Sequence, residues 1–185
     1  MEPSQTNPFT DVPEGKYYTD AVLWAISQDP KITTGVTPTT FEPDRTCTRA
    51  HVVTFLWRAN GCPEPTSLTS DFKDVNDTSK YYYKAVLWAA ENGITTGYPD
   101  GTFHPDDECT RGQVVTFLWR AKGQPKPTST ANPFADVASG QYYTTAVLWA
   151  LEAGVTNGRT ATLFGTTDAC TRGHVVTFLY RAYAD

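Results

Sequence analysis

The chain of 185 residues lacks any long apolar run. A transmembrane helix needs about 18 consecutive apolar residues, and the longest run here, around residues 21–26, suits a buried helix instead. The first eight residues are polar, so no signal peptide is visible, and we interpret the sequence as either cytosolic or the mature part of a longer chain. Basic residues number 15 against 20 acidic ones, and the net charge of −5 argues against nucleic acid as the general partner.

Catalytic motifs are also missing. The sequence has three histidines and contains no Gly-x-Ser-x-Gly segment, no paired-carboxylate motif and no phosphate-binding loop. We therefore predict that the protein is not an enzyme and has no cofactor. What the chain does have is apolar and aromatic side chains, at 39% and 13%, which can build a core and exclude wholesale disorder.

The sequence repeats itself three times, and such repeats indicate the architecture of a chain. Each unit contains Phe-x-Asp-Val, Ala-Val-Leu-Trp-Ala and Cys-Thr-Arg in the same order, followed by Val-Val-Thr-Phe-Leu. Linkers with a glycine and spaced prolines separate the units, as expected for a helix end followed by extended chain. We place the units at residues 7–62, 70–124 and 132–185.

Two segments of each unit show helical periodicity. In the first unit, apolar side chains recur at helical spacing over about residues 17–26 and again over about residues 48–59. An irregular loop rich in turn-forming residues joins the two segments. The pattern predicts a mainly α fold of helix-loop-helix units, which share one core because a unit of about 60 residues is marginal alone.

These motifs resemble the S-layer homology (SLH) domain family, and the resemblance covers all three units. The second unit carries it most fully, with Phe72-x-Asp74-Val75, Gly101-x-Phe103-x-Pro105 and Thr110-Arg111. The resemblance implies a pseudo-threefold bundle of three SLH repeats, with one helix of each repeat in the centre. It also implies an extracellular anchor on the bacterial cell wall. Its grooves between repeats would bind a secondary cell-wall polysaccharide, typically through a pyruvylated amino sugar, and hold a fused passenger domain at the surface.

The sequence departs from the family pattern at two places. The glutamate that the family has after Thr-Arg-Ala is replaced by His51, Gln113 and His174. Gln113 can complete a capping box with Thr110, whereas we expect the histidines to fill theirs only by half. The third unit has Thr162-Leu163-Phe164-Gly165 in place of Gly-x-Phe-x-Pro, so we expect its loop to shape a poorer site.

The strongest candidate ligand residues are three arginines, each at the first position of a second helix. The unpaired N–H groups at such a helix end attract anions, and the planar guanidinium suits a carboxylate. Alternatively, each arginine pairs with an acid of a neighbouring unit, such as Asp74 or Asp136. We predict that the arginines hold the acidic sugar and that Asp74 and Asp136 complete the grooves from the adjoining repeat; the arginines are Arg49, Arg111 and Arg172.

Glycines and aromatic residues give weaker signals. We expect left-handed turns at Gly35, Gly97 and Gly158 and include these residues as candidate ligand contacts. A carbohydrate-stacking platform is conceivable for the aromatic side chains of the helices, but we favour core packing for most of them. They include Tyr17, Tyr81 and Tyr142 and the tryptophans Trp24, Trp88 and Trp149.

Three of the four cysteines are equivalent by repeat, and the fourth, Cys62, stands near a linker. Three symmetric thiols cannot pair evenly, which argues against a disulfide framework, and we expect half-buried side chains. The i, i+4 spacing of cysteine and histidine in the first and third units would suit two ligands of a zinc ion. Gln113 breaks this pattern in the second unit, and we predict no metal. The equivalent cysteines are Cys47, Cys109 and Cys170.

Two other classes of function stay open from the sequence. The same bundle could be a protein–protein interaction or self-assembly module of the bacterial surface, which an exposed apolar patch would favour. A redox or metal-dependent module built on the Cys-Thr-Arg cysteines is the third hypothesis.

Overall fold

Six helices account for the regular structure of the computed structural model, which describes residues 6–184. Within that range the β-structure consists of isolated bridges, so the predicted mainly α fold is confirmed. None of these helices is long and apolar enough to cross a membrane. The helices are α1 (Thr19–Ser27), α2 (Arg49–Ala59), α3 (Tyr83–Glu91), α4 (Arg111–Ala121), α5 (Thr144–Glu152) and α6 (Arg172–Tyr183).

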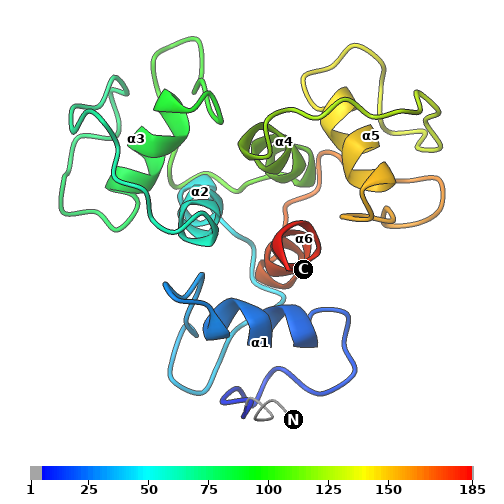
Figure 1. Ribbon diagram of the computed structural model, residues 1–185, viewed down its shortest axis with the longest axis horizontal. Helices are drawn as coiled ribbons and strands as arrows, with labels where there is room; N and C mark the ends of the chain where they lie inside the picture. The colour runs from blue at the N-terminus through cyan, green and yellow to red at the C-terminus, as the bar shows by residue number, and fades with distance from the viewer. Residues whose placement is uncertain (1–5, 185) are drawn as a thin grey trace.

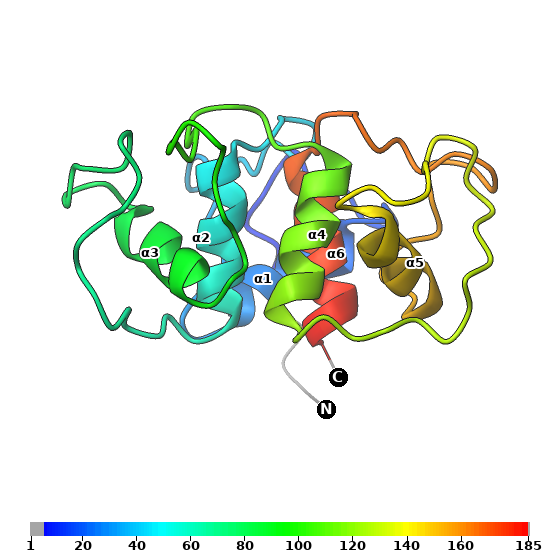
Figure 2. The same ribbon diagram turned by 90° about the horizontal axis from the view of Figure 1, so that it is seen from above.

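The second helix of each unit lies in the centre. Helices α2, α4 and α6 pack against one another, and α1, α3 and α5 surround them, so the predicted three-repeat bundle is confirmed (Figure 1). Figure 2 shows the three central helices side by side, with their first turns at the same end of the bundle. The loops that precede these helices gather at that end, and the candidate arginines therefore lie there too.

Each outer helix packs on a central helix of a different unit. Helix α3 lies on α2, α5 lies on α4, and α1 lies on α6, which closes the ring (Figure 1). Helices α1 and α2 belong to the same unit but make no close backbone contact. A packed lobe therefore combines the end of one unit with the beginning of the next, and the apolar stripe of each helix is covered by a neighbouring repeat.

A closed ring of backbone hydrogen bonds joins the three units. The amide of Cys47 donates to the carbonyl of Cys170, that of Cys109 to Cys47, and that of Cys170 to Cys109, at 2.9, 2.9 and 2.8 Å. All three side chains are completely buried, so the expectation of half-buried cysteines was wrong. The three segments converge there, and only a small side chain fits where they meet. Burial raises the pKa of Cys47 and Cys109 to about 12 and also raises that of Cys170.

Three phenylalanines fix the loops between the helices. Phe41, Phe103 and Phe164 have no exposed surface, and each burial stabilises the fold by roughly 1.5–3 kcal/mol. Each ring contacts the phenylalanine of the Phe-x-Asp-Val motif in its own unit, with centroids 5.6–5.8 Å apart. The loops thus have a defined shape, and their carbonyl groups are held at fixed positions.

Candidate functional site

Two grooves between adjacent units contain two of the three predicted arginines and two of the three predicted glycines. The first, which we call the Arg49 groove, has a volume of about 220 Å³ and brings Arg49 next to Gly97. The second, the Arg111 groove, has a volume of about 420 Å³ and brings Arg111 next to Gly158. In both, the arginine comes from one unit, and the glycine loop and the wall of the second helix come from the next.

Each arginine is clamped by the loop of the following unit. The Arg49 Nε–H donates to the carbonyl of Phe103 at 2.8 Å, and its guanidinium carbon lies 4.7 Å from the centre of that ring. Arg111 binds the carbonyl of Phe164 at 2.9 Å and lies 4.9 Å from its ring. Burial lowers the pKa of Arg111. Within residues 6–184 neither guanidinium has a carboxylate partner, so both positive charges remain available to a ligand.

The aspartates do not pair with these arginines. Asp74 accepts hydrogen bonds from the amides of Phe103 and His104, both at 2.8 Å, and Asp136 binds the equivalent amides of Phe164 and Gly165. Burial opposes ionisation of Asp136, but these amides outweigh it and lower its pKa. The ion-pair alternative is therefore wrong for both residues. Asp74 and Asp136 act within their own units, where they hold the loop whose carbonyl clamps the arginine.

The amides at the start of the central helices are not free for an anion, contrary to our expectation. In α4 the amide of Arg111 donates to the carbonyl of Asp168, and that of Gly112 to the carbonyl of Thr166, at 2.9 and 3.0 Å. The loop of the next unit lies so close that a Cβ at Gly112 would be 3.0 Å from the Thr166 oxygen. The equivalent amides of α2 and α6 have the same kind of partner. A ligand must therefore bind through side chains of the grooves.

Two of the three predicted glycine turns are confirmed. Gly97 and Gly158 have φ of 66° and 83°, in the left-handed region that favours glycine. Gly35 does not have a positive φ, so that prediction was wrong. Glycine is needed there because a Cβ would lie 2.1 Å from the carbonyl oxygen of Thr37 and 2.5 Å from the ring of Phe9.

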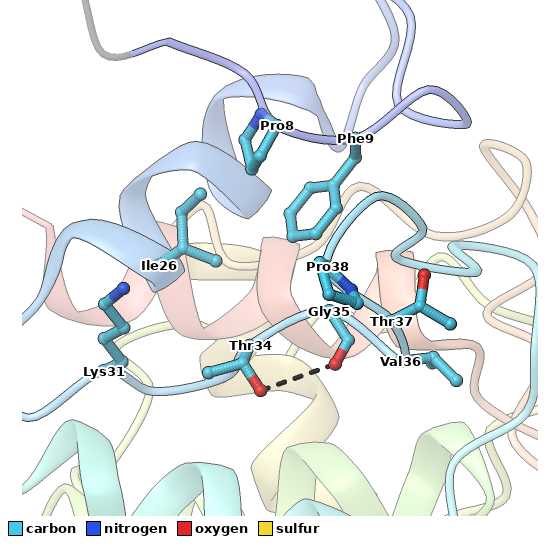
Figure 3. A pocket seen from close by; sticks show the side chains of 9 residues that line it. All are labelled: Pro8, Phe9, Ile26, Lys31, Thr34, Gly35, Val36, Thr37 and Pro38. Atoms are coloured by element: carbon cyan, nitrogen blue, oxygen red, sulfur yellow. Dashed lines mark hydrogen bonds between the residues drawn. The ribbon is translucent and has the colours of Figure 1, made fainter.

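The surroundings of Arg172 differ from those of the other two arginines. Besides the bond from Nε to the carbonyl of Phe41, its Nη2 lies 3.4 Å from the Thr33 hydroxyl and 3.3 Å from the Thr34 carbonyl. More of the N–H groups of Arg172 are therefore hydrogen-bonded within the protein than those of Arg49 or Arg111. Gly35 instead lines a pocket of about 470 Å³ that is built from the first unit alone, with Lys31 as its single cation (Figure 3).

The histidines at the capping positions behave differently from each other. The amide of Thr48 donates to Nδ1 of His51 at 3.2 Å, so this histidine completes a full capping box and our expectation of a half-filled one was wrong. His174 fills its box by half, as predicted, because its ring contacts the hydroxyl of Thr171 instead of the amide. The imidazole nitrogen takes the place of the glutamate oxygen in the first case.

Core packing, which we favoured for most of six aromatic residues, was wrong for three of them, all tyrosines. Tyr17, Tyr81 and Tyr142 are 51–54% exposed, and Tyr17 and Tyr142 line the Arg111 and Arg49 grooves respectively. The ring of Tyr17 stacks on His174 with centroids 5.2 Å apart. Each is the first member of a tyrosine pair whose second member is more buried, and the two rings meet edge to face. In the first unit the helical spacing of Tyr18 with the buried Ala21 and Val22 leaves Tyr17 off the apolar face, which is the signal for its exposure.

The sequence analysis also missed a second arginine in each groove. Arg120 lines the Arg49 groove and donates to the carbonyl of Ile94 at 3.0 Å; Arg181 lines the Arg111 groove and donates to Val155 at 3.2 Å. Neither groove has an aspartate or glutamate in its lining. In a chain with a net charge of −5, two arginine-lined grooves without acidic residues are a local reversal of charge. Such grooves suit an anionic ligand.

No metal centre accompanies them in the described range: no three His, Cys, Asp or Glu side chains between residues 6 and 184 gather closely enough to hold an ion. All four cysteines are free thiols. The fold and the grooves define a tandem-repeat, mainly α module with cationic clefts between its units.

The chain belongs to the S-layer homology domain family, which matches residues 8–53, 71–115 and 133–176. It is 36% identical over 90 residues to cell surface glycoprotein 1 of Acetivibrio thermocellus, and the aligned segment covers 45% of this chain and 4% of that protein. It is 33% identical over 124 residues to a cell surface protein of Thermoanaerobacter kivui, covering 64% and 16% respectively. A cellulosome-anchoring protein of A. thermocellus is 31% identical over 83 residues, covering 43% of this chain and 18% of the relative. The match thus spans less than a fifth of each of these relatives.

Proposed function

We propose that the protein is a non-catalytic anchor that attaches non-covalently to the bacterial cell wall by binding an acidic glycan in its grooves. The observation that carries this proposal is that two grooves are lined by at least two arginines each and by no acidic residue. A pyruvylated amino sugar of a secondary cell-wall polysaccharide is the ligand that fits, since it joins a carboxylate to a carbohydrate ring. Its carboxylate would take the terminal N–H groups of Arg49 or Arg111.

The geometry supports this chemistry. The Nε–H of Arg49 and Arg111 is used by a loop carbonyl, which fixes the guanidinium in the groove before a ligand arrives. A half-exposed tyrosine, Tyr142 or Tyr17, lines the same groove and offers an aromatic edge or face to the sugar ring. Gly97 and Gly158 line the grooves with bare backbone, and a Cβ at either position would lie 2.4–2.5 Å from the ring of Phe72 or Phe134 in its own unit.

The relatives favour the same function and an extracellular location. Their names describe cell surface and cellulosome-anchoring proteins. This chain matches a small share of each, as expected if such a module anchors a much larger passenger. The protein's place is then the bacterial cell surface, and its partners are the wall glycan and any domain fused to it.

Sedimentation with purified cell-wall sacculi tests the proposal. The full chain should co-sediment with intact sacculi and stay in the supernatant after mild acid has removed pyruvate and the attached polymer. Unchanged binding to stripped sacculi would mean that peptidoglycan or non-specific adhesion is responsible. An absence of binding to any wall preparation would contradict the proposal and favour the protein–protein interaction module.

Substitutions then connect binding to the grooves. The double variant Arg49→Gln, Arg111→Gln should lose roughly tenfold or more in affinity for sacculi, because each site loses a charge-assisted hydrogen bond. Arg45→Gln is the matched control, since it removes an exposed arginine that pairs with Glu42 outside both grooves. Both arginines pack on buried phenylalanines, so the melting temperature must be measured alongside. Equal binding by the double variant and the control, both folded, would exclude the arginines as ligand residues.

A further inference from the structure

The residue that follows the loop glycine differs in each unit although its backbone position is the same. Val36, Tyr98 and Arg159 each donate their amide to a carbonyl four residues further on, at 2.8 Å. The side chains therefore project from equivalent points of the three loops. Two of them, Tyr98 and Arg159, line the Arg49 and Arg111 grooves.

In the Arg49 groove this position forms an aromatic wall. The guanidinium carbon of Arg49 lies 4.8 Å from the centre of the Tyr98 ring. The ring of His104 meets the Tyr98 ring edge to face with centroids 4.6 Å apart, and the side-chain amide of Gln113 donates from Nε2 to the Tyr98 hydroxyl at 3.3 Å. Tyr98 is thus held on two sides, and it covers one face of the arginine. The groove has a volume of about 220 Å³.

In the Arg111 groove the same position carries a cation. Arg159 projects there, and Gly165 stands at the position that His104 has in the second unit. A Cβ at Gly165 would lie 2.6 Å from the Cδ of Arg159, so the glycine makes room for the arginine. The Nη1 of Arg159 binds the carboxylate of Asp168, which orients the side chain and leaves its Nε and Nη2 without a partner in the described chain. The departure of the third unit from the family pattern, which we expected to give a poorer site, thus accompanies a larger groove with one more arginine in its lining.

The Arg111 groove has one more arginine in its lining than its neighbour. Three arginines line it, Arg111, Arg159 and Arg181, against two in the Arg49 groove, and its volume is about 420 Å³. His174 also lines it, but burial and then the nearby arginines lower its pKa to about 4, so its ring is neutral at pH 7. The additional arginine is Arg159; Asp168 pairs with its Nη1 and balances its charge, but the Nε and Nη2 groups remain as charged N–H donors for a ligand.

We propose that the residue after the loop glycine determines which ligand each groove accepts: the Arg111 groove selects a sugar with two anionic groups, and the Arg49 groove a sugar with one. Arg159 binds the second group, a phosphate or a further carboxylate, while Tyr98 packs against an uncharged part of the ligand. This inference rests on the proposed function, because it assigns different acidic sugars to the same pair of grooves.

Amide NMR titrations of the full chain test the inference groove by groove. The probes are glucuronic acid, with one carboxylate, and glucuronic acid 1-phosphate, with a carboxylate and a phosphate. The amide of Gly97 reports on the Arg49 groove and that of Gly158 on the Arg111 groove, since each lines its own groove. At Gly158 the phosphorylated probe should bind about tenfold more tightly than glucuronic acid, as expected for one added charge-assisted contact. At Gly97 the two affinities should agree within about twofold.

Exchange of the two side chains provides the decisive variants. Arg159→Tyr should abolish the preference at Gly158 and leave Gly97 unaffected, and Tyr98→Arg should create the preference at Gly97. Arg159→Gln separates loss of charge from the bulk of tyrosine, and Arg45→Gln controls for the loss of one exposed charge elsewhere. A preference at Gly158 that survives Arg159→Tyr and Arg159→Gln would overturn the inference, and so would two grooves that fail to distinguish the probes. Either result leaves wall binding intact in the sedimentation assay, whereas failure of the proposed function removes that binding.

Discussion

Thr54 has a buried hydroxyl that lacks a hydrogen-bond partner, and its two repeat equivalents show what is missing. The side chain is 1% exposed, and within residues 6–184 its Oγ1 is the one fully buried side-chain polar atom left without a partner. Thr116 and Thr177 stand at the same position of α4 and α6, and each hydroxyl donates to the carbonyl one turn earlier, of Gly112 or Gly173, at 2.7 Å. One chain thus contains the same threonine in unsatisfied and satisfied form.

Replacement by valine should have opposite effects at these positions. An unpaired buried hydroxyl costs about 1–3 kcal/mol, so Thr54→Val should raise the free energy of unfolding by about 1 kcal/mol after the change in packing. Thr116→Val removes a hydrogen bond with a net value of about 0.5–1.5 kcal/mol and should lower the free energy of unfolding by that amount. The two variants should therefore differ by about 2 kcal/mol, or roughly 4–8 °C in melting temperature for a chain of this size.

Urea unfolding followed by tryptophan fluorescence measures this difference, with Thr177→Val as a second satisfied control. The slope of the transition should be the same in all variants, because none changes the surface exposed on unfolding. If Thr54→Val destabilised the chain as much as Thr116→Val, then the Thr54 hydroxyl would have a partner in solution, and the reasoning from its isolation would fail.

Lowering the pH from 7 to 4 should reduce the free energy of unfolding by about 1–2 kcal/mol through His174, allowing for its partial exposure. Burial and then the nearby arginines lower the pKa of His174 in the folded chain to about 4, so the unfolded chain takes up the proton first, near pH 6.5. The variant His174→Gln should therefore flatten the plot of urea-derived unfolding free energy against pH over this range. An unchanged plot would contradict the role of His174. Gly158→Ala should lower the free energy of unfolding by about 2 kcal/mol more than Gly154→Ala in the same assay. Both glycines have a positive φ, but only a Cβ at Gly158 would meet backbone oxygens, at 2.5 and 2.9 Å; equal losses of stability would refute this reasoning. In native buffer a thiol reagent should modify one cysteine per chain, the partly exposed Cys62, and mass spectrometry would count the modified thiols. Rapid reaction of a second thiol would contradict the burial of Cys47, Cys109 and Cys170.

The sequence predicted the helices well because each carries its own local signal. The apolar periodicity located both helices of every unit, and Thr48, Thr110 and Thr171 marked the start of the central ones as capping residues. Two of the three arginines and two of the three glycines also lie in grooves between units, because most equivalent residues of tandem repeats have similar surroundings.

What the sequence did not predict depends on contacts between units. Periodicity alone cannot say that the amides of Arg111 and Gly112 are taken by the next loop, or that Asp136 binds backbone and not arginine. It also cannot say that the exposed ring of Tyr17 stacks on His174 of the third unit. The chemistry of the grooves follows from these contacts.

The closure of the ring by α1 and α6 has a consequence for synthesis on the ribosome. Helix α1 is the first of the six to emerge, and the helix that covers it is the last. Until α6 emerges, the apolar face of α1, with Ala21, Val22 and Ala25, lacks the helix that covers it in the folded protein. The chain cannot complete its fold from the N-terminus onward, so a nascent chain stalled before α6 should bind chaperones or be open to proteases at α1. The packing of the first helix therefore depends on the emergence of α6.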